Sequence, residues 1–113
     1  MKKIEAIVRP EKLESVRMAL EQNGCEGLTI SEIEGHGKQK GIVQQWRGEK
    51  YKINLMPKIK IEVVVCEKDV ERITKAIIDS ARTGEVGDGK VFIYNIDTAI
   101  RIRTGEKGEK AIM

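Results

Sequence analysis

Hydrophobic and polar residues alternate in two stretches of the chain, residues 2–9 and 58–66. In the first stretch Ile4, Ala6 and Val8 fall on one side of an extended backbone, and charged residues fall on the other. Alternation with a period of two is typical of a β-strand with one buried face. The pattern predicts strands in both stretches, and two shorter runs predict further strands at about 28–34 and 91–96.

Two other stretches carry apolar residues at the spacing of an α-helix. The first covers residues 13–20 and stops before Asn23-Gly24, a pair that commonly ends helices. The second covers residues 70–81. Each stretch predicts an amphipathic helix that follows a strand.

Two tandem strand–helix–strand units predict an α/β (α+β) sandwich of the ferredoxin-like type, with the order βαββαβ. The helices should cover one face of the sheet. The other face would carry apolar groups such as Ile7, Val64 and Cys66, so we expect a homo-oligomer that covers it. We expect one domain over residues 1–113, in which 99–103 form a short extended segment before a loose polar tail.

Residues 35–57 show no periodicity and include several glycines. A structureless segment of this length is uncommon in a small domain and usually has a function. It carries basic residues together with Trp46, Arg47 and Tyr51, and an aromatic residue near an arginine is a frequent interface anchor. We predict a mobile loop that contacts a protein partner. A solvated hairpin and RNA binding stay open as alternatives.

The bulk composition restricts the classes of function. The chain has 113 residues, enough for one domain, and 40 % of them are hydrophobic, enough for one core. A net charge of +3 is too small to indicate nucleic-acid binding. No apolar run has the roughly 18 to 20 residues of a membrane span, and the first residues lack the apolar core of a signal peptide. We therefore expect a cytoplasmic protein that enters no membrane.

Cys25 and Cys66 are far apart in the sequence and lack the spacing of metal ligands. We expect both to be reduced packing residues, with a disulfide or redox pair as the alternative.

Residues 84–90 read Gly-Glu-Val-Gly-Asp-Gly-Lys and match the letters of a phosphate-binding P-loop. A P-loop NTPase is not expected, because Val91 stands where Ser or Thr is required and because the turn follows a helix instead of a strand. Glycines nonetheless let backbone N–H groups approach an anion closely, and Lys90 adds a positive charge. An ordinary glycine-rich connection is the alternative.

Arg101 and Arg103 stand two apart in the segment expected to be extended, which would place both guanidinium groups on one face. Two such groups suit a polyphosphate, although a solvated edge strand would show the same pattern. Together with the glycine turn they predict a nucleotide phosphate cleft, built by one subunit or by two. No Ser, Cys or second His accompanies His36 at a suggestive spacing, so we expect His36 to pack at the root of the loop. No carboxylate, His or Ser is visibly placed as a base beside the phosphate turn, so we expect a regulator. A slow ATP hydrolase or phosphotransfer enzyme is the alternative.

Three stretches, residues 35–51, 58–64 and 81–106, together resemble the PII nitrogen-regulatory signal-transduction proteins. The third is the most specific, with Ala-Arg-Thr-Gly-Glu-Val-Gly-Asp-Gly-Lys followed by Ile-Arg-Ile-Arg-Thr-Gly-Glu. The resemblance implies a homotrimer of ferredoxin-like subunits, in which ATP and ADP compete for clefts between subunits. It also implies a protruding T-loop at about 37–57, a phosphate-binding B-loop at about 82–90, and a C-terminal segment at about 98–113.

The resemblance implies the contacts of three ligands. The nucleotide contacts would be Thr29, Gly35, Gly37, Lys38, Gln39, Glu62, Val64, Gly87, Asp88, Gly89, Lys90, Arg101 and Arg103. The Mg²⁺ of Mg-ATP would be held by Gln39, and the effector 2-oxoglutarate by Gln39, Lys40, Gly41, Lys58 and Gly87. Because the effector would chelate the metal, it should need bound Mg-ATP, and each ligand should tighten the other.

The implied function is control of nitrogen assimilation through the T-loop. The partner would be an ammonium channel, glutamine synthetase or a related regulator, contacted by Trp46 and Arg47. Tyr51 matches a tyrosine that some members carry as a uridylylation site. A nitrogenase-dedicated regulator, or a PII-like sensor of another ligand, is the alternative.

Overall fold

A computed structural model describes residues 1–36, 42–46, 49–53 and 55–113, with side chains described outside 35–55. The elements in chain order are β1 (Lys2–Val8), α1 (Leu13–Gln22), β2 (Thr29–His36), β3 (Ile42–Trp46), β4 (Glu49–Ile53), β5 (Leu55–Val65), α2 (Val70–Ala81) and β6 (Lys90–Asn95). Short 3₁₀ turns at Pro10–Lys12, Glu67–Asp69 and Gly108–Ile112 complete them. None of the described helices is long and apolar enough to cross a lipid bilayer.

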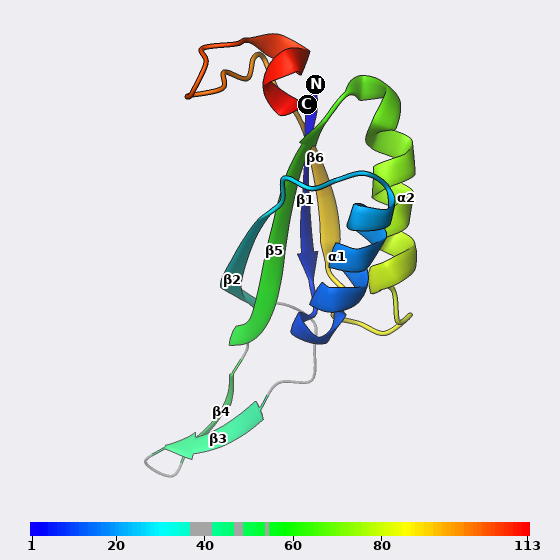
Figure 1. Ribbon diagram of the computed structural model, residues 1–113. Helices are drawn as coiled ribbons and strands as arrows, with labels where there is room; N and C mark the ends of the chain where they lie inside the picture. The colour runs from blue at the N-terminus through cyan, green and yellow to red at the C-terminus, as the bar shows by residue number, and fades with distance from the viewer. Residues whose placement is uncertain (37–41, 47–48, 54) are drawn as a thin grey trace.

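Four strands form one sheet in the order β2–β5–β1–β6, and all neighbouring strands are antiparallel. Both helices lie on the same face of this sheet (Figure 1). The strand order and the two helical crossovers agree with the ferredoxin-like arrangement predicted from the sequence, so the α+β architecture is confirmed.

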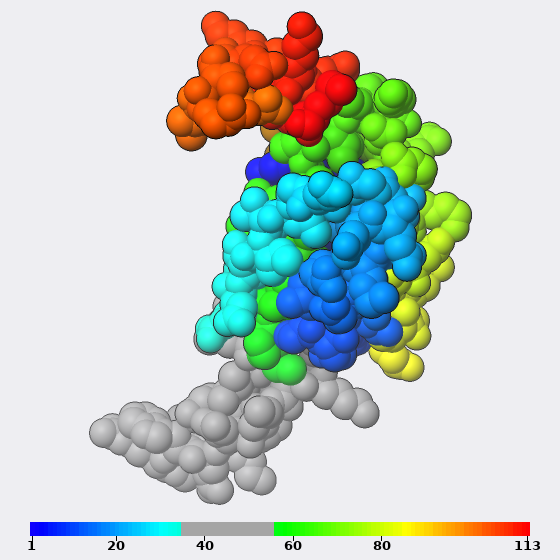
Figure 2. Space-filling view, in the orientation of Figure 1, coloured from blue at the N-terminus to red at the C-terminus, as the bar shows by residue number. Residues whose placement is uncertain are grey.

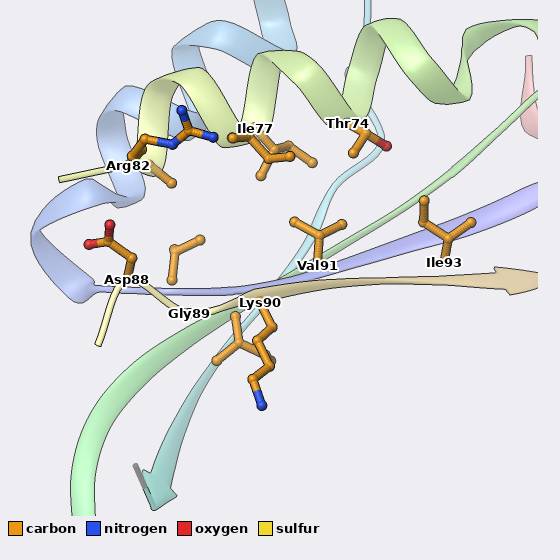
Figure 3. A pocket seen from close by; sticks show the side chains of 12 residues that line it. Thr74, Ile77, Arg82, Asp88, Gly89, Lys90, Val91 and Ile93 are labelled. Carbon is orange, nitrogen blue, oxygen red and sulfur yellow. The ribbon is translucent and has the colours of Figure 1, made fainter. Parts of the chain in front are cut away.

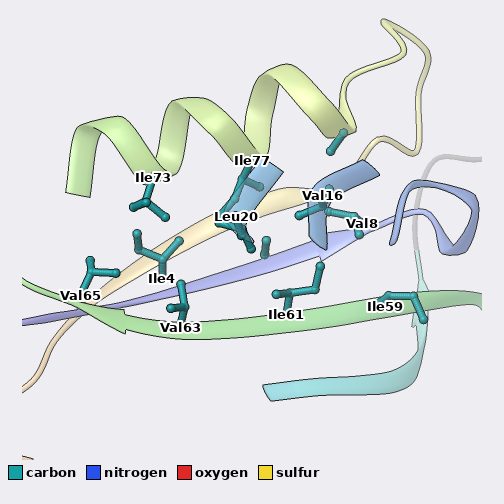
Figure 4. Close-up of a cluster of buried hydrophobic side chains, with 12 residues drawn as sticks. Ile4, Val8, Val16, Leu20, Ile59, Ile61, Val63, Val65, Ile73 and Ile77 are labelled. Atoms are coloured by element: carbon teal, nitrogen blue, oxygen red, sulfur yellow. The ribbon is translucent and has the colours of Figure 1, made fainter. Parts of the chain in front are cut away.

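The core lies between the helices and the sheet (Figure 4). Alternate residues of β1 and β5 meet the buried stripes of α1 and α2 there, as the two periodicities predict. Its buried members are Ile4, Ala6, Val8, Val16, Leu20, Ile59, Ile61, Val63, Val65, Ile73, Ile77 and Ala81.

The face of the sheet that carries no helix, called the open face below, is more polar than predicted. Lys3 Nζ lies 3.2 Å from Glu62 Oε2 and 4.6 Å from the centre of the Tyr94 ring. The Tyr94 hydroxyl donates a hydrogen bond to Glu5 Oε2 at 3.0 Å. Apolar groups lie beside this network, since β6 leaves Phe92 45 % exposed. The face is therefore mixed, with apolar groups around paired charges.

The segment predicted to be structureless contains regular structure. Strands β3 and β4 pair as an antiparallel hairpin, which corresponds to the hairpin left open as an alternative. Strands β2 and β5 also extend further than predicted, to His36 and from Leu55. The cause is the β-branched and aromatic content of the two short strands, combined with the low cost of pairing segments close in sequence. The predicted contacts Gly37, Lys38, Gln39, Lys40, Gly41 and Arg47 lie outside the described residues.

The prediction of an extended segment over 99–103 holds only as far as Ile100, which forms an antiparallel β-bridge with Lys107, and the prediction of a loose tail is wrong. Residues 102–104 form a turn, closed by the Gly105 N–H on Arg101 O at 2.7 Å and by the Arg101 N–H on Glu106 O at 2.9 Å. Gly105 has φ +75°, a conformation that favours glycine. The Arg101 side chain also holds the tail, with hydrogen bonds to Lys110 O at 3.0 Å and Met113 O at 2.9 Å. Figure 2 shows the result as a lobe at the end of the domain.

Candidate functional site

The predicted phosphate turn joins the end of α2 to the start of β6. Gly84, Gly87 and Gly89 all have positive φ, at 91°, 104° and 103°. A Cβ on Gly89 would lie 1.7 Å from the backbone oxygen of Ile7, so only glycine fits there. The glycine turn is thus packed directly against the end of β1.

The Asp88 carboxylate organises this turn. Its Oδ2 accepts the N–H groups of Thr83 and Gly84, both at 2.8 Å, and its Oδ1 accepts the Thr83 hydroxyl. Oδ1 also accepts Arg9 Nε at 3.0 Å. The Thr83 hydroxyl, the two backbone N–H groups and Arg9 together hold the pKa of Asp88 well below its usual range. The carboxylate is therefore ionised at neutral pH, and both of its oxygens are engaged within the turn.

Lys58 approaches the same turn from β5. Its side chain is buried, with 8 % of the residue exposed, and Nζ donates to Gly87 O at 2.6 Å. Burial lowers the pKa of Lys58, and the positive charge of Arg9 lowers it further. The ammonium has two more donor hydrogens, so it can bind an anion while it stays on Gly87.

Lys90, the first residue of β6, lies opposite Ile7 of β1 in the register. Its side chain points away from Thr74 and Ile77, toward the open face of the sheet (Figure 3). Alternation along β5 places Lys58 on the same face, because Ile59 is in the core. The structure thus brings the glycine turn, Lys58 and Lys90 together at one end of the open face.

The predicted adenosine contacts share the open face but lie further along it. Thr29 and Glu62 are opposite one another in the register, and Val64 follows on the same side of β5. Six residues separate Val64 from Lys58, which is about 20 Å of strand. Glu62 and its register partner Thr29 lie four residues along the strand from Lys58, which is about 13 Å.

The segment after β6 that carries Arg101 and Arg103, orange in Figure 1, lies at the opposite end of the sheet from the glycine turn. The Ile96 N–H donates to Met1 O, so the end of β6 lies beside the start of β1. The glycine turn instead contacts the opposite end of β1, at Ile7. Strand β6 spans the distance between them. A single chain therefore does not bring the turn and the arginines into one cleft, because the strand between them carries the chain across the sheet. Only the two-subunit alternative keeps them in one cleft.

A cavity of about 410 Å³ lies between α2 and β6 (Figure 3). Its walls are mainly apolar and include Ile77, Val91 and Ile93, with Thr74 at one side. The Thr74 hydroxyl is buried and has no hydrogen-bond partner among the described residues. Asp88, Gly89 and Lys90 also line this cavity at the end near the glycine turn, although the Lys90 side chain points to the open face.

Sequence reasoning missed the parts played by Arg9 and Thr83. Alternation assigned Arg9 only to the polar side of β1, and the turn motif drew attention to its glycines. A signal was present in each case: a charged residue at a strand end before Pro10, and a hydroxyl five residues before an aspartate.

Metal ligands and thiols add little to this site. No three His, Cys, Asp or Glu residues in the described ranges lie close enough together to hold a metal ion. Both cysteines are free thiols, as predicted, and burial raises the pKa of Cys25.

A family model described as "Nitrogen regulatory protein P-II" matches residues 1–106. The chain belongs to this family. The P-II assignment confirms the resemblance found in the sequence, and it covers the sheet, both helices, the glycine turn and the arginine pair.

Several P-II relatives match over nearly the full length. "Nitrogen regulatory protein P-II 2" of Methanothermobacter thermautotrophicus is 54 % identical, over 99 % of this chain and 97 % of its own. The P-II proteins of Haemophilus influenzae and Synechocystis sp. are 50 % and 49 % identical, each over 99 % of this chain and 100 % of their own. All three are named as regulatory proteins, which agrees with a general role in nitrogen regulation.

Proposed function

We propose that this P-II protein is a signal transducer that senses ATP or ADP together with 2-oxoglutarate and controls nitrogen assimilation. The observation that carries the proposal is the Asp88-organised glycine turn, with Lys58 and Lys90 beside it, in a chain of this family. Glycine-rich backbone beside two ammonium groups is suited to a polyphosphate.

The nucleotide is proposed to lie between two subunits of a homotrimer. The turn and Lys90 of one subunit would bind the phosphates from one side, and Arg101 and Arg103 of a neighbour from the other. The separation of the two groups within one chain supports this arrangement. It also gives the open face a cover, since exposed apolar groups of β6 would be buried by another copy.

The effector 2-oxoglutarate is proposed to bind beside the phosphates, with one carboxylate on Lys58. Gln39 would hold the Mg²⁺ that the effector chelates, and Lys40, Gly41 and Gly87 would complete its contacts. Because ATP and 2-oxoglutarate would coordinate the same Mg²⁺, binding of either should strengthen binding of the other.

The output is proposed to pass through the T-loop to a cytoplasmic partner, an ammonium channel or a nitrogen-assimilation enzyme such as glutamine synthetase. Trp46 and Arg47 would contact the partner, and Tyr51 is a candidate for uridylylation. Lys58 stands just after the T-loop and contacts the phosphate turn, so a ligand there can influence both.

Titration calorimetry tests this function directly. ATP should bind the wild-type protein, and 2-oxoglutarate should bind only when Mg-ATP is present. Binding of 2-oxoglutarate without nucleotide, or no binding at all, would contradict the proposal. Turnover of ATP far above background would favour the hydrolase alternative instead.

A further inference from the structure

Two side chains from outside the glycine turn hold two successive carbonyl groups within it. Arg9 Nη2 donates to Val86 O at 2.8 Å, and Lys58 Nζ donates to Gly87 O at 2.6 Å. The same Arg9 guanidinium donates through Nε to Asp88 Oδ1 at 3.0 Å. Arg9 therefore fixes the turn at two points, one on its backbone and one on its organising carboxylate.

Fixing a carbonyl also fixes the amide that follows it. The peptides of this turn are trans, and in a trans peptide the C=O of one residue points opposite to the N–H of the next. Because Val86 O and Gly87 O are drawn toward Arg9 and Lys58, the N–H groups of Gly87 and Asp88 point away from them. Neither of these N–H groups has an acceptor among the described residues, whereas those of Thr83 and Gly84 are bound by Asp88.

We propose that Arg9 is a positioning residue for the phosphate site of this P-II protein. Its guanidinium would clamp Val86 O and Asp88 together, so that the Gly87 and Asp88 N–H groups are presented to a nucleotide phosphate. This inference rests on the proposed function, because it assigns a role in nucleotide binding.

The chemistry of the clamp requires arginine. The two acceptors are engaged by two different nitrogens of one planar guanidinium, Nε and Nη2. A lysine ammonium is a point charge and cannot reproduce the fixed fork. The side chains of Arg9 and Asp88 are only 16 % and 24 % exposed, so solvent screens this pair less than a surface ion pair.

The clamp matters because the turn is rich in glycine. Gly84, Gly87 and Gly89 give the free backbone many alternative conformations, and ordering them at the moment of binding opposes affinity. With Arg9 in place the ordering is complete before the ligand arrives. Without it, Val86 O loses its partner, Asp88 loses one of its donors, and the two amides are no longer held toward the ligand.

The test compares Arg9→Met and Arg9→Lys with the wild-type protein by titration calorimetry with ATP. Arg17→Met is the matched control, since the ion pairs of Arg17 within the described part of the chain are with Glu14 and Glu21 of its own helix. Arg9→Met should weaken ATP binding about tenfold or more, Arg9→Lys should restore part of that loss, and Arg17→Met should change nothing.

Amide NMR spectra recorded with and without ATP separate a positioning role of Arg9 from a purely structural one. In the wild-type protein ATP should shift the Gly87 and Asp88 amide signals. In Arg9→Met these shifts should shrink while signals of the core strands stay in place. If Arg9→Met does not fold, the same measurement on Arg9→Lys decides.

The inference and the proposed function fail in different ways. If the wild-type protein binds no nucleotide, the proposed function is wrong. If the wild-type protein binds ATP, but a folded Arg9 variant binds it equally well with unchanged Gly87 and Asp88 shifts, the positioning role is wrong.

Discussion

Replacing Gly89 with alanine should push the glycine turn off the end of β1. The new Cβ would lie 1.7 Å from Ile7 O and 2.8 Å from Ile7 C, and both are backbone atoms that cannot rotate away. A carbon and a carbonyl oxygen need about 3.3 Å, so the two segments must separate by about 1.6 Å. A shift of that size breaks the 3.0 Å contact of Arg9 with Asp88.

The expected decrease in the free energy of unfolding of Gly89→Ala has two contributions. Alanine at φ +103° costs about 1–2 kcal/mol for backbone strain alone. Displacement of the turn and loss of its hydrogen bonds raise the total destabilisation to about 3–5 kcal/mol.

Gly84→Ala is a matched control for this prediction. Gly84 also has positive φ, at 91°, but a Cβ there meets nothing within 4 Å. Gly84→Ala should therefore lower the free energy of unfolding only by the backbone strain, about 1–2 kcal/mol. Urea unfolding at one fixed chain concentration measures both variants, because the proposed assembly would make stability depend on concentration. Equal destabilisation by the two alanines would refute the reasoning.

Three further predictions concern charged groups at the same turn. Asp88 has a depressed pKa, so its stabilising effect is present above the unfolded pKa near 4 and is lost as the pH falls below that value. The free energy of unfolding, measured from about pH 6 to pH 2, should therefore depend less on pH in Asp88→Asn than in the wild-type protein. The same pH dependence in both proteins would count against this prediction. Lys90→Ala should weaken ATP binding by about 1.5–3 kcal/mol in calorimetry, whereas Lys75→Ala, on the exposed side of α2, should not. Lys58→Met should reduce 2-oxoglutarate binding in the presence of Mg-ATP more than ATP binding itself, and equal losses would contradict its assigned role.

The sheet and the helices could be predicted because burial on one face leaves a periodic record in the sequence. Ile4, Ala6 and Val8 are buried as their alternation predicts, and so are Ile73 and Ile77 at helical spacing. The same periodicity misled at the C-terminus, where Arg101 and Arg103 flank an isoleucine as in a strand. Ile102 is fully exposed there, because hydrogen bonds to residues further along the chain fold the segment into a turn.

The glycine turn was found from its letters, but its internal bonding was not. The contact of Arg9 with Asp88 joins residues 79 positions apart, and no local pattern encodes such a pair. The separation of the turn from the arginine pair was predictable in principle. A strand was predicted at about 91–96, and six extended residues cover about 20 Å. The sequence alone left open whether one subunit or two build the cleft, and the length of this strand favours two.

The central claim is that one nucleotide is bound by the turn of one chain and the arginines of another. It is tested by co-refolding equal amounts of Lys90→Ala and Arg103→Ala chains and titrating the mixture with ATP. Each variant alone should lack tight binding, whereas random mixing should restore a wild-type cleft at about a quarter of the sites. If the mixture shows no tight site although both variants assemble and exchange chains, the two groups do not meet across a subunit boundary, and the account is wrong.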